Sequence, residues 1–314
     1  MTENHNHLPP ARAWLGPLLL LAGGACIGLA PIGLRYGLND LGPQAIAFWR
    51  FLLATPMLFL LLVGIEKRLP SKPNHFILLA GIFFALDIGL WHWALTFTTV
   101  ANATFIVNLG NICVGFAAWL LFKEKPTSVW FVAVFVAFCG AALLSFGGGE
   151  NSKGDIRGDL LALCAAFLVA NYMLFSKMAR NRLGAMDVIF WLTVVETATA
   201  ACMVVVFGED FFPASLSGLA APLFLAIVAQ VAGQGLIIAG LGRTPAAIAG
   251  IIVLIQPVIA AAISWQLFDE ALSVLQGGGG ALILLGIWLS QGGIKRRKAR
   301  AEAKRLQEAA SSAE

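Results

Sequence analysis

Amide side chains stand in the middle of two long apolar runs of this 314-residue chain. Asn108 and Asn111 lie within residues 101–122, and Gln256 lies within residues 247–268. An amide carries both a hydrogen-bond donor and an acceptor, and apolar surroundings offer no water to satisfy either. Amides at this depth therefore indicate a site for a small polar molecule, such as one that carries a carboxylate and an ammonium group.

Further polar side chains recur at helical spacing inside other apolar runs. Asp87 and Trp91 are four residues apart, as are Gln230 and Gln234, so each pair shares one face of a helix. The candidates for a substrate-binding site are Asp87, Trp91, Asn108, Asn111, Asn171, Tyr172, Gln230, Gln234 and Gln256. The alternative is that the amides only join helices by hydrogen bonds, as they often do in membrane proteins.

Three ionisable residues, Asp87, His92 and Glu196, lie deep in apolar segments, where a charge costs about 3 kcal/mol or more without water or a partner. They are the candidates for a coupling site. Asp87 would contact a substrate ammonium or carry a proton, or else make a local hydrogen bond. For His92 a satisfied contact between helices is the favoured interpretation, and Glu196 is either a packing partner or a coupling site. Arg50 lies nearer a segment end, where it can reach the membrane surface or pair.

The composition indicates an all-α integral membrane protein. Hydrophobic residues make up 59% of the chain and charged residues only 12%, against about 25% in soluble domains, and the mean hydropathy is +0.83. The apolar segments are long enough to cross about 30 Å of hydrocarbon as helices. We predict ten spans, at residues 15–38, 43–64, 76–97, 101–122, 127–146, 158–179, 186–207, 215–240, 246–268 and 273–291.

Two local features refine this expectation. Pro31 and Pro257 fall inside predicted spans, and because proline removes an intrahelical hydrogen bond, each permits a bend. Trp14, Trp130 and Trp288 fall near span ends, where tryptophans of the membrane interface are common.

The second half of the chain repeats the first. Between the fourth and ninth segments, Trp119 matches Trp265 at an offset of 146 residues, and between the second and seventh, Trp49 matches Trp191 at an offset of 142. The simplest interpretation is a duplicated five-helix unit. The predicted parts are an N-terminal segment at 1–14, a first repeat at 15–146, a linker at 147–157, a second repeat at 158–291 and a basic tail at 292–314.

Loop charges predict how the two repeats are oriented. The loop before the third segment carries Lys67, Arg68 and Lys72, whereas the equivalent loop of the second half carries Glu209 and Asp210. An odd number of spans in each repeat places the halves in opposite orientations, and basic loops favour the cytoplasmic side. We therefore expect inverted repeats with both termini in the cytoplasm.

These repeated stretches carry a family resemblance. The sequence TTVANATFIVNLGNICVGFAAWLLFKEKPT from Thr98 and its echo GRTPAAIAGIIVLIQPVIAAAISWQLFDEALS from Gly242 resemble the two EamA repeats of the drug/metabolite transporter superfamily. The run Gly89-Leu90-Trp91-His92-Trp93 is similar to the YddG-type exporters of aromatic and other amino acids. The resemblance implies a ten-helix alternating-access carrier with a central cavity, in the inner membrane of a bacterium.

The sequence thus predicts a secondary transporter that exports small metabolites, with an amino acid as the expected substrate. The alternatives are a channel, a non-transporting membrane sensor, or a carrier of another metabolite class. The chain has no GxxxxGK[ST] phosphate loop and no catalytic motif, and its five cysteines lack metal-ligand spacing. We therefore expect no ATP-driven pump, no enzyme, no cofactor, no metal and no nucleic-acid partner, and a chain that works in the lipid bilayer as a monomer.

Overall fold

The computed structural model describes residues 14–98, 100–122, 127–146, 155–268 and 273–290, and all the regular structure in these ranges is helical. In chain order the elements are α1 (Leu15–Ile27), α2 (Ala30–Gly37), α3 (Pro43–Glu66), α4 (His75–Ala94), α5 (Val100–Phe122), α6 (Ser128–Phe146), α7 (Ile156–Arg180), α8 (Ala185–Phe207), η2 (Leu216–Leu219), α9 (Ala220–Phe224), η3 (Leu225–Gln234), α10 (Gly235–Leu241), α11 (Ala246–Val253) and α12 (Ile255–Phe268). A last helix covers Val274–Ser290. The predicted N-terminal segment, linker and basic tail lie almost wholly outside the described residues.

Within the described part of the chain, seven helices are long and apolar enough to cross a membrane. Three shorter apolar helices, Ile106–Leu121, Ser128–Leu143 and Val274–Ser290, fall on the remaining predicted spans. The all-helical membrane class is therefore supported, whereas the number of ten crossings stays a prediction. The helix bounds agree with the predicted spans to within about three residues.

The two prolines divide their spans where their chemistry predicts. Pro31 leaves the carbonyl of Ile27 without its helical donor, and α1 ends at Ile27. Pro257 does the same to Val253, where α11 ends before α12 begins at Ile255. Each helix is thus interrupted midway through a span, at the place where its proline permits a bend.

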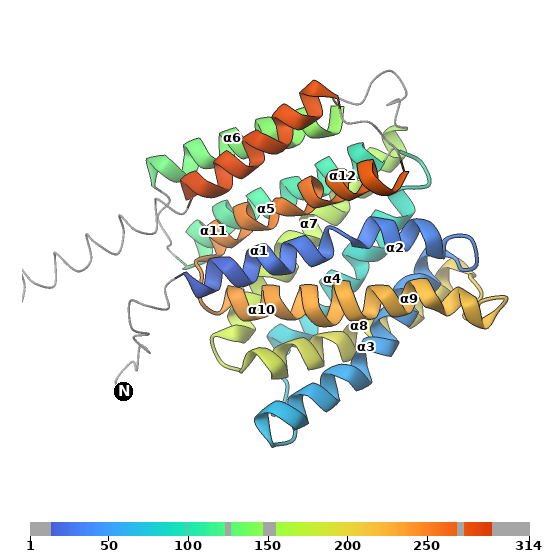
Figure 1. Cartoon of the computed structure of the whole chain (residues 1–314). Coiled ribbons are helices and arrows are strands. Elements are labelled where there is room, and N and C mark those ends of the chain that lie inside the picture. The colour runs from blue at the N-terminus through green and yellow to red at the C-terminus, as the bar shows by residue number, and fades with distance from the viewer. Residues whose placement is uncertain (1–13, 99, 123–126, 147–154, 269–272, 291–314) are drawn as a thin grey trace, which may run out of the picture.

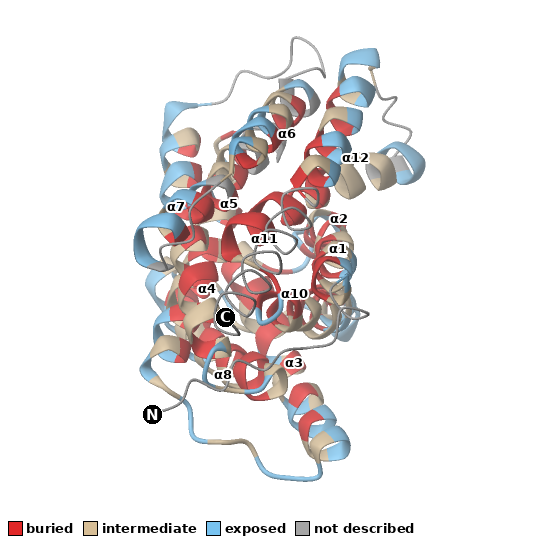
Figure 2. Cartoon of the chain, turned by 90° about the vertical axis from the view of Figure 1, so that its left-hand side faces the viewer, coloured by how far each residue is buried: buried red, intermediate tan, exposed pale blue. Residues whose placement is uncertain are grey.

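The helices form one bundle in which neighbours along the chain are often not neighbours in space (Figure 1). α4 packs against α7 and α8, α5 packs against α7 and α11, and α1 packs against η3, α10 and α11. Buried residues lie on the sides of the helices that face the interior, and exposed residues lie on the outer sides (Figure 2). The outer faces carry large apolar side chains such as Leu120, Phe135 and Trp288, as expected of a surface covered by lipid.

Matching positions of the two halves meet at the contact between α3 and α8. Thr55 and Thr197 are 142 residues apart, and their Oγ1 atoms lie 3.3 Å from each other. Each hydroxyl also donates to the carbonyl four residues earlier in its own helix, on Phe51 and Thr193 respectively. Residues separated by the repeat offset thus face each other with the same local geometry.

The matched tryptophans of the two halves make equivalent bonds at separate places. The Trp49 indole on α3 donates to the carbonyl of Phe211 over 2.5 Å, in the segment that follows α8. The Trp191 indole on α8 donates to the carbonyl of Ser71 over 2.7 Å, in the segment that follows α3. Each of these two helices therefore holds the loop that leaves the other.

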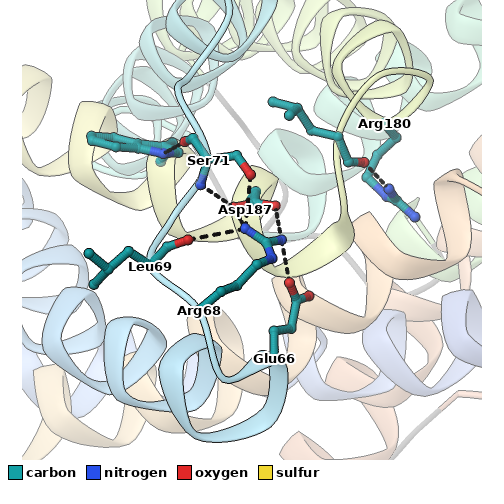
Figure 3. A network of polar contacts seen from close by, with 8 residues as sticks. Glu66, Arg68, Leu69, Ser71, Arg180 and Asp187 are labelled. Carbon is teal, nitrogen blue, oxygen red and sulfur yellow. Dashed lines mark hydrogen bonds and ion pairs between the residues drawn. The ribbon is translucent and has the colours of Figure 1, made fainter.

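The loop after α3 is also tied to α8 by charge (Figure 3). The Arg68 guanidinium donates to both carboxylate oxygens of Asp187, at 3.0 and 2.5 Å, and pairs with Glu66. The amide of Ser71 donates to Asp187 over 2.7 Å. The hydrogen bond to Asp187, more than any other contact, raises the pKa of Arg68. The loop after α8 is held differently, since one Glu209 oxygen accepts from the backbone amides that begin α3.

Trp130 does not belong to an interfacial belt, and that expectation was wrong. Its side chain is buried, and its indole donates to the carbonyl of Ala247 over 3.0 Å, so it joins α6 to α11. Gly115 leaves the room for this ring, because a Cβ there would lie 2.2 Å from the indole. Trp14 and Trp288 are both exposed, as expected of tryptophans at an interface.

Candidate functional site

A cavity of about 110 Å³ lies inside the bundle, between helices of both halves of the chain. The two broken spans border it with Pro31 and Pro257. Its polar lining comes from α3, α4, α5, α7, η3 and α12, and consists of Arg50, Asp87, Asn108, Asn111, Tyr172, Gln234 and Gln256. The remaining wall is apolar and includes Trp91 and Phe84. An apolar cavity with a few convergent polar groups is typical of a small-molecule site.

The two asparagines of α5 form a bonded pair on the cavity wall. Asn111 donates from Nδ2 to Oδ1 of Asn108 over 3.0 Å, and both side chains are buried. The Asn111 Oδ1 has no hydrogen-bond partner among the described residues. A buried acceptor of this kind costs about 1 to 3 kcal/mol unless a ligand or water satisfies it. Asn111 is therefore fixed on its donor side and has an unsatisfied acceptor.

Gln256 lines the same cavity from α12, and α11, the helix before it, makes a close contact with α5, which carries this pair. Gly250 on α11 allows the approach, because a Cβ at this position would lie 2.0 Å from the backbone oxygen of Asn111. Gln256 follows the break in this span and is only partly buried. The repeated stretches found in the sequence therefore meet at the cavity.

A second bonded pair, Tyr172 and Gln234, lies on the opposite repeat. The Gln234 amide donates to the Tyr172 hydroxyl over 2.7 Å, and the tyrosine ring lies 4.7 Å from the Phe84 ring. Gln234 ends η3, a π-helical stretch, and such stretches are frequent at functional sites. These groups place a polar patch next to an aromatic wall.

Asp87 and Trp91 both line the cavity from α4, as their spacing predicts. Asp87 is only 3% exposed, and its Oδ1 has no hydrogen-bond partner among the described residues. The local hydrogen bond that the sequence suggested for Asp87 is not formed at this oxygen. A residue of the cavity lining thus carries a buried carboxylate oxygen that nothing in the described chain satisfies.

Arg50 is a cavity residue that the sequence did not place in the site. Its guanidinium is buried, donates from Nη2 to Gln230 Oε1 over 3.0 Å, and lies within 6 Å of the centres of the Phe51 and Phe84 rings. It interacts electrostatically with Asp87 and Glu196. The sequence did show a cation within an apolar span. In the structure the Arg50 side chain is buried and bonds to Gln230, and it does not reach the membrane surface.

The other four candidates lie outside the cavity lining. Gln230 stands behind it and links Arg50 to Glu196, with its Nε2 donating over 2.6 Å to Glu196 Oε2. His92 has its Nδ1 2.9 Å from the carbonyl of Pro43, so it makes the contact between helices that the sequence favoured. Asn171 donates to the Phe167 carbonyl of its own helix over 2.8 Å, which leaves it no part in the cavity.

Fold and cavity together define the class: a polytopic helical membrane protein with a polar-lined cavity between its helices. The model of the EamA-like transporter family matches the chain twice, over residues 14–146 and 156–291. The chain belongs to the EamA-like transporter family, within the drug/metabolite transporter superfamily, and the resemblance found in the sequence is confirmed.

Curated relatives of similar length agree with this family. A probable amino-acid metabolite efflux pump of Escherichia coli is 24% identical over 87% of this chain and 93% of its own length. An uncharacterized transporter of Archaeoglobus fulgidus is 26% identical over 82% of this chain and 91% of its own length. A crystal structure with 15% identity superposes with a TM-score of 0.75 over 88% of this chain and 96% of that one, which supports the fold.

Proposed function

We propose that this protein is a secondary transporter that exports small metabolites, with neutral and aromatic amino acids as its substrates. The observation that carries this proposal is the central cavity, which is lined by three residues that carry buried, unsatisfied polar atoms of opposite character. Asp87 Oδ1 and Asn111 Oδ1 are acceptors for an ammonium group, and Arg50 Nε is a donor for a carboxylate. Trp91 and Phe84 supply an apolar wall for a side chain.

The substrate class has independent support. The Escherichia coli relative and a Salmonella typhimurium relative, 26% identical over 86% of this chain, are both named as probable amino-acid metabolite efflux pumps. A channel or a sensor is the alternative. The broken spans favour a carrier, because discontinuous helices around a central site are typical of proteins that work by alternating access.

The proposal includes ten crossings, arranged as inverted five-helix repeats over residues 15–146 and 158–291 in an inner membrane. It is supported by the two family matches, by the facing threonines of α3 and α8, and by the equivalent tryptophan bonds of these helices. Rocking one repeat against the other would open the cavity to each side in turn, with the protein working as a monomer.

The orientation gives a first prediction. We expect a reporter fused after Glu314 to face the cytoplasm and a reporter inserted at Ser152 to face the periplasm, because the basic loops lie on one side. Alkaline phosphatase and fluorescent-protein fusions measure this. Both reporters on the same side would contradict the inverted repeat.

The substrate class gives a second prediction, which tests the proposed function. Cells that overproduce the protein should tolerate toxic analogues of aromatic or neutral amino acids at higher concentrations, because export lowers their cytoplasmic level. The matched control is an equally abundant Asn111→Leu variant. Equal tolerance in the parent and the variant, for every analogue, would contradict the proposal.

A further inference from the structure

Two carboxylates share one buried cation at the centre of this protein. Asp87 on α4 and Glu196 on α8 are at most 3% exposed, and Arg50 on α3 interacts electrostatically with both. Glu196 is reached from Arg50 through the Gln230 amide, with bonds of 3.0 and 2.6 Å. If all three groups were ionised, the described interior would hold one uncompensated negative charge, which apolar surroundings strongly disfavour.

The hydrogen bonds also leave these carboxylates incompletely satisfied. Asp87 Oδ1 and Glu196 Oε1 are buried without hydrogen-bond partners among the described residues. An ionised carboxylate is stabilised by hydrogen bonds to its oxygens, and here each group lacks a bond to one of them. One added proton, held by either group, removes the excess charge and lessens this demand.

The remaining ionisable groups nearby do not supply the missing positive charge. Tyr172 on α7 is neutral when protonated, and its hydroxyl already accepts from Gln234. His92 on α4 lies outside the cavity lining, bonds to the Pro43 carbonyl, and meets repulsion from Arg50. The described residues of η3, α9 and α10 are all uncharged.

We infer that the empty site holds one proton, carried either by Asp87 on the cavity wall or by Glu196 behind Gln230, and exchanges it for positive charge brought by a ligand. When a monocationic amine binds at Asp87, a carboxyl O–H bond breaks, the proton leaves to solvent, and the ammonium pairs with the carboxylate. A zwitterion brings no net charge, so its ammonium pairs with the Asp87 carboxylate and the proton stays on Glu196. An anion requires uptake of a second proton.

This inference rests on the proposed function, because it concerns ligands of the same cavity. Its consequence is a transporter whose coupling depends on ligand charge. Cationic amines would leave in exchange for protons, whereas zwitterionic amino acids would pass without net proton movement.

Three probes that share one aromatic ring and differ in charge provide the test. Titration calorimetry of the full chain at pH 7, in two buffers of different protonation enthalpy, counts the protons exchanged per bound ligand. We expect one proton released with phenethylamine, none with phenylalanine and one taken up with 3-phenylpropionate. The apparent affinity for phenethylamine should rise about tenfold per pH unit, while that for phenylalanine should stay constant.

Variants then locate the proton. Glu196→Gln should abolish proton release by phenethylamine, and Asp210→Asn, at an exposed carboxylate, should leave it unchanged. His92→Gln should also leave it unchanged, and loss of release in this variant would overturn the assignment to the carboxylates. If Glu196→Gln does not fold, the three probes on the parent protein still decide the matter.

The outcomes separate this inference from the proposed function. Binding of phenylalanine, together with phenethylamine binding that releases no proton, would overturn the inference and leave the proposed function intact. Failure of all three probes to bind would contradict the proposed substrate class, and the inference with it.

Discussion

Asn111→Leu and Gln256→Leu should each reduce transport efficiency by about 5- to 150-fold while the protein still folds. Leucine is similar in size to both amides but offers no hydrogen bond. Each lost bond to substrate costs about 1 kcal/mol, rising towards 3 kcal/mol when a charged group is left unpaired, which gives the stated range. Initial rates of substrate uptake into proteoliposomes measure the effect, with the amount of inserted protein as the reference.

Asn171→Leu is the matched control for this prediction. Asn171 is also an amide within an apolar span, but it bonds to its own helix and does not line the cavity. We expect its variant to transport like the parent. If Asn111→Leu and Gln256→Leu instead unfold in detergent, these amides only join helices. If both transport like the parent, the substrate site lies elsewhere.

Gly250→Val should destabilise the protein and remove most of its transport activity. A Cβ at Gly250 would lie 2.0 Å from the backbone oxygen of Asn111, so α5 and α11 would have to move apart. Added volume in a packed interior typically costs about 1 to 3 kcal/mol, and this movement also displaces an amide of the cavity. The melting temperature in detergent and the transport rate should both fall.

Gly64→Ala is the control for Gly250→Val. A Cβ at Gly64 meets nothing within 4 Å, so the substitution adds no steric conflict, and it replaces a glycine within α3 by a better helix former. Its melting temperature should be unchanged or slightly higher. An equally stable Gly250→Val variant would show that α5 and α11 do not depend on this close approach.

The sequence predicted much of the fold because membrane helices are encoded locally. Length and hydropathy place each span, and proline chemistry places the breaks near Ile27 and Val253. The offset of 142 residues found between Trp49 and Trp191 also separates Thr55 and Thr197, which the structure brings together. The burial of Trp130 could not be predicted in this way, because it depends on the room left by Gly115.

Site residues could be predicted from the sequence where their placement depends on a single helix. The prediction was poorer where several helices together form the surroundings of a residue. Asp87 and Trp91 line the cavity together, as spacing on one helix requires. Arg50 was not placed there, because its surroundings come from α4, α8 and η3 as well as its own helix. Asn171 has the same side chain as Asn111, and only the packing of the bundle distinguishes them.

Counterflow tests the central claim, that this protein is a carrier with its substrate site in the central cavity. Proteoliposomes loaded with unlabelled phenylalanine are diluted into a trace of labelled phenylalanine, without any ion gradient. The account predicts a transient accumulation of label above equilibrium in the parent protein, strongly reduced in Asn111→Leu, because an alternating-access site exchanges one molecule for another. Label that only equilibrates in the parent, as through an open pore, or an Asn111→Leu variant that accumulates label like the parent, would contradict it.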